Sequence, residues 1–159
     1  MNPALPTLNP AARPIIYSVD PGVEYFALAR YINGDLFSVH TFPIDARPNF
    51  AYPREIEMLV IEVPQIYDAR KGGTGARARK SDVADTIFAA GRIADRYAHV
   101  TKCTPAQWKG QLTKAQDHER TRNALTEAEN AVIDAVRTKE ERGHILDAVG
   151  IGLWFLWRR

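Results

Sequence analysis

Runs of alternating or continuous apolar residues dominate the chain up to residue 63, and helix-like periods dominate after residue 81. The predicted strands cover 15–20, 24–32, 36–42, 56–63 and a short fifth one over 99–103. Asn33-Gly34 separates the second strand from the third, and this pair accommodates the positive φ angles of a tight hairpin turn. The first three strands are therefore expected to form an antiparallel meander. The near-continuous apolar run of 56–63 is typical of a central strand.

Three helices and one helical turn are predicted after these strands. Ser81 and Asp82 are N-cap residues for a helix that continues to about Ala98. The other segments are a brief turn at 104–108, a long polar helix over 117–137 and, after a break at Arg142-Gly143, a last helix over 144–157. This order of elements indicates a mixed α/β domain around one central sheet.

The composition is that of an ordinary globular protein, with 45% apolar and 25% charged residues. Residues 15–159 are interpreted as a single domain, and the proline-rich residues 1–14 as a flexible arm. One cysteine excludes an intramolecular disulfide and a cysteine-based zinc site. The apolar run 148–157 is about half a membrane span. A membrane anchor is therefore not expected. The single cysteine fits a reducing compartment, and a cytoplasmic location is expected.

Two acidic residues stand at the ends of predicted strands. Asp20 ends the first strand, directly before Pro21-Gly22, where an aspartate commonly bonds its own backbone; that turn role is one interpretation. Glu62 ends a strand suited to burial, where an unpaired carboxylate is costly. It is either a salt-bridged or edge-facing residue, or a member of a functional cluster.

Asp147 and His144 stand three residues apart on the last predicted helix, so they share one face. The structural interpretation is an aspartate favoured near a helix start and a satisfied core histidine. In the functional interpretation, His144 and Asp147 join Asp20 and Glu62 around a hard cation such as Mg²⁺. Two such ions activate water and stabilise the leaving oxygen in phosphodiester hydrolysis. His144 would ligate, order a water or transfer a proton.

These motifs, in this order, resemble the RuvC-type Holliday junction resolvases of the ribonuclease H-like superfamily. The resemblance covers about 15–157 and rests on four segments. They are Val19-Asp20-Pro21-Gly22, Ile61-Glu62-Val63-Pro64-Gln65, Pro105-Ala106-Gln107-Trp108-Lys109-Gly110 with Lys114, and His144-Ile145-Leu146-Asp147-Ala148. The Trp-Lys-Gly form of the third segment is more similar to phage or prophage members than to the bacterial housekeeping enzyme.

The resemblance implies a ribonuclease H-like mixed five-stranded sheet, in which parallel strands follow the meander and helices flank both. It also implies a homodimer that nicks two opposed strands of a four-way DNA junction, in DNA recombination or repair. The cofactor would be Mg²⁺, for which Mn²⁺ substitutes. The implied ligands are Asp20, Glu62, His144 and Asp147. Lys109 would be the first candidate for the lysine that faces the phosphate, and Lys114 the second.

A basic, glycine-rich segment over 70–80 follows the Glu62 strand and would overhang the site, where it would contact DNA phosphates. The alternative is a solvated basic loop. Tyr67 would stack on an unpaired base, or else belong to the core. The predicted DNA-binding residues are Tyr67, Arg70, Lys71, Arg77, Arg79, Lys80, Lys109 and Lys114.

Two segments depart from the family pattern. The family carries a helix between the third strand and the second acidic strand, but 43–55 is short and proline-rich. The segment 117–137 is long for its counterpart. One alternative function is another nuclease of this superfamily, acting on flaps, branched DNA or hybrids. A second is a catalytically idle DNA-binding module. A sugar-kinase or actin-like nucleotide-binding protein would need two lobes of this kind, so no nucleotide cofactor is expected.

Overall fold

Five strands form one mixed sheet in this computed structural model, which describes residues 15–44, 57–64 and 80–158. The strands are β1 (Ile15–Pro21), β2 (Tyr25–Ile32), β3 (Asp35–Pro43), β4 (Glu57–Glu62) and β5 (His99–Cys103), in the order β3-β2-β1-β4-β5. β1 and β3 pair with β2 in antiparallel fashion, whereas β4 pairs in parallel with both β1 and β5. The predicted meander and the central place of the fourth strand are confirmed.

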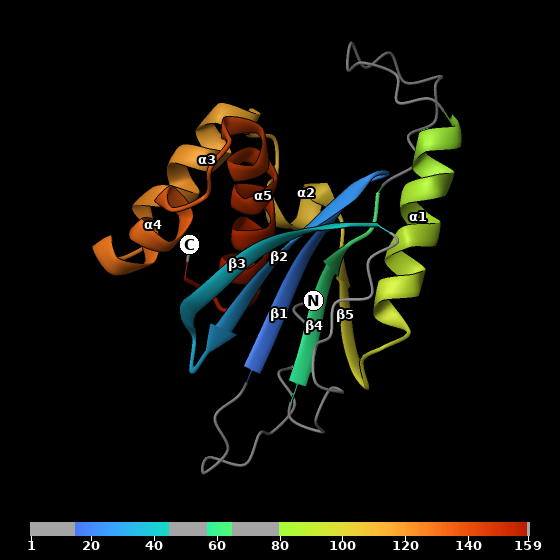
Figure 1. The fold of residues 1–159 in the computed structure, drawn as a ribbon, viewed down its shortest axis with the longest axis horizontal. Coiled ribbons are helices and arrows are strands. Elements are labelled where there is room, and N and C mark those ends of the chain that lie inside the picture. Colours follow the sequence, from blue (N-terminus) through green and yellow to red (C-terminus); the bar gives the residue numbers. More distant parts are fainter. Residues whose placement is uncertain (1–14, 45–56, 65–79, 159) are drawn as a thin grey trace.

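Helices cover both faces of the sheet (Figure 1). They are α1 (Lys80–Ala94), α2 (Pro105–Trp108), α3 (Lys114–Asn123), α4 (Glu127–Asp134) and α5 (Lys139–Phe155). Val19 and Ile61 point to the α1 face, where they pack with Ile93. Their neighbours in the strands alternate to the opposite face, which α5 covers. Asp20 and Glu62 therefore point to the α5 side at the carboxyl ends of two adjacent parallel strands.

Contacts between α5 and the first two strands set the position of that helix. The Ser18 hydroxyl donates to the Ala148 carbonyl at 2.7 Å, and the Tyr31 hydroxyl donates to the Val149 carbonyl at 2.8 Å. Gly152 allows this close approach, because a Cβ there would lie 2.3 Å from the Tyr31 ring. α5 is thereby held with its amino-terminal half beside the carboxyl end of β1.

The helix boundaries differ from three of the sequence predictions. The predicted helix over 117–137 is two helices, because Thr126 and Glu129 form a capping box that starts α4. Arg142-Gly143 does not interrupt a helix. Thr138 and Glu141 form another capping box, so α5 begins before these residues and continues through Gly143. These caps were present in the sequence as Thr-x-x-Glu patterns, and they outweigh the helix-breaking tendency of a single glycine.

The helix after β4 is also shorter than predicted. It begins at Lys80 and ends at Ala94, so Ser81 and Asp82 lie within it. After Ala94 the chain tightens, with the Tyr97 amide donating to the Ala94 carbonyl at 3.1 Å, and then enters β5. No helix among the described residues is long and apolar enough to cross a membrane. The predicted arm 1–14 and most of the proline-rich segment 43–55 lie outside the described residues.

Candidate active site

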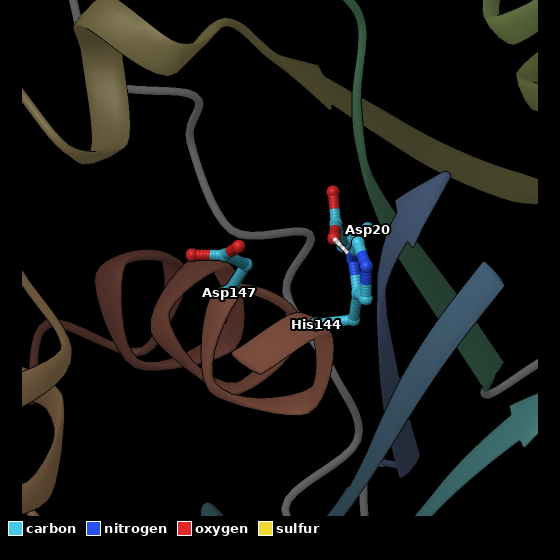
Figure 2. A group of neighbouring side chains, drawn as sticks. All are labelled: Asp20, His144 and Asp147. Carbon is cyan, nitrogen blue, oxygen red and sulfur yellow. Dashed lines mark hydrogen bonds and ion pairs between the residues drawn. The ribbon is translucent and has the colours of Figure 1, made fainter. Parts of the chain in front are cut away.

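Asp20, His144 and Asp147 meet where the end of β1 faces α5 (Figure 2). Each offers one ligand atom such that these atoms all lie within 4.8 Å of one another. The His144 Nδ1 lies 3.2 Å from an Asp20 carboxylate oxygen. The structure thus brings together three of the four predicted metal ligands, from the first strand and the last helix. A donor set of two carboxylates and an imidazole suits a divalent cation.

Glu62 stands next to this group on β4 and is oriented by a tryptophan. The Trp108 indole Nε1 donates to Glu62 Oε2 at 2.5 Å. Burial and the charge of Asp20 raise the pKa of Glu62 to about 7, against the hydrogen bond from Trp108, which lowers it. Among the residues that the structure describes, Glu62 is not part of the three-residue cluster itself. Its electrostatic coupling to Asp20 nevertheless places it beside that cluster.

The site concentrates negative charge in a largely buried position. Burial raises the pKa of Asp20, and the charge of Asp147 adds to this effect, while the hydrogen bond with His144 opposes it. In return, the bond to Asp20 raises the pKa of His144. Carboxylates that are buried together resist ionisation, and a bound cation would remove that resistance. The electrostatics therefore fit a cation at this site.

The carboxylate of Asp147 is held by two cationic or potentially cationic side chains of α3. Lys114 Nζ lies 2.9 Å from Oδ2, and His118 Nε2 lies 2.9 Å from Oδ1. Burial opposes the charge on Asp147, but these two partners outweigh it, and the pKa lies below its ordinary value. His118 was not among the residues predicted from the sequence. The signal was its spacing of four residues from Lys114, which puts both on one helical face.

Trp108 is buried, with 3% of its surface exposed, and packs within the hydrophobic core. Its carbonyl accepts a hydrogen bond from the Arg120 guanidinium at 3.2 Å, and that guanidinium also pairs with buried Asp117. Lys109 Nζ lies 5.6 Å from the centre of the Trp108 ring. Its charge lowers the pKa of Glu62, so it stands near the acidic cluster.

The remaining predicted DNA contacts are not located by the structure. Tyr67, Arg70, Lys71, Arg77 and Arg79 lie outside the described residues. Lys80 is the first residue of α1, and its side chain is likewise outside them. Lys109 and Lys114 both lie near the acidic residues, and of the two Lys114 makes the direct contact with a carboxylate.

No family model matches this chain, and no curated protein matches it. Solved structures do. RuvC from T. thermophilus in complex with a Holliday junction substrate aligns with a TM-score of 0.55 and 17% identity, over 89% of this chain and 91% of that one. A Thermus thermophilus RuvC structure aligns with a TM-score of 0.51 and 15% identity, over 88% and 92% of the chains.

The Fowlpox virus resolvase, solved with its substrate Holliday junction DNA, aligns with a TM-score of 0.55 and 17% identity. That alignment covers 90% of this chain and 97% of the resolvase. The similarity therefore spans nearly whole domains, in a bacterial and in a viral protein. The sequence resemblance and the structural comparison point to the same architecture, and the chain has the ribonuclease H-like fold of the RuvC-type proteins.

Proposed function

We propose that this protein is a metal-dependent, structure-selective DNA endonuclease that resolves four-way junctions by paired, symmetric nicks. The observation that carries the proposal is the convergence of Asp20, His144 and Asp147 at the carboxyl end of β1, with Glu62 on the adjacent strand. The fold that presents this cluster also occurs in two proteins solved with Holliday junction DNA.

The residues of the cluster would hold Mg²⁺, or Mn²⁺ in its place. Asp20, His144 and Asp147 supply the convergent atoms, and Glu62 supplies a carboxylate beside them. Bound divalent ions would activate the attacking water and stabilise the leaving oxygen of the phosphodiester bond. Burial, with a smaller contribution from neighbouring carboxylates, raises the pKa values of Asp20 and Glu62, and this supports the assignment because a dication favours the ionised forms.

Hydrogen bonds hold two of the carboxylate ligands in place. His144 fixes the Asp20 carboxylate, and Trp108 fixes that of Glu62. Lys109 and Lys114 put positive charge beside the acids, where a phosphate group would approach. The basic segment 70–80 follows shortly after β4 in the sequence and would extend the same contact surface along the DNA.

The proposal includes a homodimer, because two nicks at opposed strands need two sites. α1 carries exposed apolar side chains for it: Phe88 is 69% exposed and Ile87 is 38% exposed. An exposed phenylalanine next to an exposed isoleucine is suited to burial against a second copy. A two-fold dimer also matches the symmetry of a four-way junction.

The test compares synthetic four-way, flap and linear duplex DNA, with Mg²⁺ and with a chelator, using the unmodified protein and Asp20→Asn. We expect nicking of the junction that needs Mg²⁺ and is lost in the variant. Preferential cutting of the flap would favour the alternative superfamily nuclease. Binding of DNA without cutting under any metal would favour the idle module. Unchanged activity of Asp20→Asn would contradict the assigned metal site.

A further inference from the structure

The Asp147 carboxylate has a separate partner on each oxygen, and both partners come from one face of α3. Lys114 contacts Oδ2 and His118 contacts Oδ1, each at 2.9 Å. The two residues are one helical turn apart. Gly143 of α5 faces the same pair, because a Cβ there would lie 3.9 Å from the His118 ring and from Lys114 Nζ. α3 is thus placed to control the orientation of one acidic residue.

The two contacts differ in charge and in freedom. The Lys114 side chain is 54% exposed, whereas that of His118 is 19% exposed. An ammonium group is a point charge on a flexible stem, and it repels a dication that approaches the same carboxylate. A histidine ring donates one hydrogen bond through Nε2 whether or not Nδ1 also carries a proton. Its contact is therefore compatible with a cation on the other side of the carboxylate.

We infer that His118 is a positioning residue that keeps Asp147 oriented for metal binding, while Lys114 is the contact that the incoming cation displaces. This inference rests on the proposed function and adds a division of labour on α3 to it. His118 retains Oδ1 in the free and in the loaded protein. Lys114 balances the charge of Asp147 in the free protein and releases Oδ2 when the ion binds. It is then available to face the phosphate.

The two contacts are thus expected to have opposite effects on metal affinity. Removal of a hydrogen bond that orients a ligand weakens metal binding by about 10–100-fold. Removal of a competing unit charge about 4 Å from a dication in water-like surroundings strengthens metal binding about 30-fold. A purely structural role of α3 would give losses of the same sign in both cases.

The experiment measures Mn²⁺ binding to the full chain without DNA, by electron paramagnetic resonance titration of free Mn²⁺. The variants are His118→Ala, His118→Gln and Lys114→Met. Lys139→Met, at an exposed lysine of α5, removes the same charge and serves as the control for Lys114. Circular dichroism establishes that each variant is folded.

We expect weakened binding in His118→Ala, restored binding in His118→Gln, whose amide replaces the Nε2 donor, and tighter binding in Lys114→Met than in Lys139→Met. Unchanged affinity in His118→Ala, or a loss in His118→Gln as large as in His118→Ala, would overturn the positioning role. Weakened binding in Lys114→Met would overturn the displacement. Absence of Mn²⁺ binding by the unmodified chain would overturn the proposed metal site itself, an outcome distinct from the other three.

Discussion

Glu129 joins three parts of the fold and provides a quantitative test of the structure. One carboxylate oxygen accepts from the Leu36 amide of β3, and the other accepts from the Thr126 amide and hydroxyl at the start of α4. The Arg158 guanidinium bonds both oxygens at 2.7 Å. These donors, with Arg158 first, outweigh the cost of burial and lower the pKa of Glu129 to about 2.

The shift from 4.5 to about 2 corresponds to roughly 3 kcal/mol of stability at neutral pH. Because the pKa is lower in the folded state, this stability is present above the unfolded value and is lost as the pH falls towards 2. Linkage gives a loss of about 2 kcal/mol between pH 7 and pH 3. Glutamine mimics the protonated carboxyl group, so Glu129→Gln should lack this contribution at every pH.

Urea denaturation at pH 7, 5, 4 and 3 measures the free energy of unfolding of the unmodified protein and of Glu129→Gln. We expect the free energy of unfolding of the unmodified protein to exceed that of Glu129→Gln by about 3 kcal/mol at pH 7 and by about 1 kcal/mol at pH 3. Glu127→Gln is the control, because Glu127 is exposed in the first turn of the same helix. The lowered pKa of Glu129 would be refuted if this difference did not change with pH, or if Glu127→Gln showed the same difference.

Three further predictions concern the site, the dimer and the packing of α5. Trp108→Phe keeps a ring in the core but removes the donor to Glu62, and so raises the pKa of that carboxyl group. Nicking at pH 7 should therefore fall about tenfold and recover at pH 8–9, which a pH–rate profile measures. Phe88→Glu should convert a dimer to a monomer in analytical ultracentrifugation; a monomeric unmodified protein would contradict this. Gly152→Ala should destabilise by about 1–3 kcal/mol in urea, because its Cβ meets a buried tyrosine ring, whereas Gly91→Ala, with open space around it, should not.

The sequence predicts the sheet well because each strand carries its own pattern. Asn33-Gly34 marks the hairpin, and both residues have the positive φ angles expected, 55° and 90°. Alternation along β1 places Asp20 opposite to Val19, on the α5 face. Periodicity alone does not show that Asp20 and Asp147 converge; the residue types suggested a shared cation site, and the resemblance to the RuvC-type resolvases supported it.

Contacts between distant segments account for what the sequence analysis missed. His118 meets Asp147 only because α3 packs on α5, and neither helix encodes that choice locally. In the same way, the sequence alone gives Arg158 no role beyond that of a surface charge, because its partner Glu129 is distant in the sequence. The division of 117–137 into two helices was, in contrast, locally encoded at Thr126 and Glu129.

The activity proposed for this cluster of acids and a histidine is the symmetric nicking of a four-way junction. The most direct measurement maps the cut positions on an immobile junction in which each of the four strands is labelled in turn, in Mg²⁺, followed by ligase treatment of the products. We expect nicks at matching positions in two opposed strands, sealed by the ligase, and none with Asp20→Asn. Unpaired cuts at unrelated positions, or equal cutting of linear duplex, would contradict it.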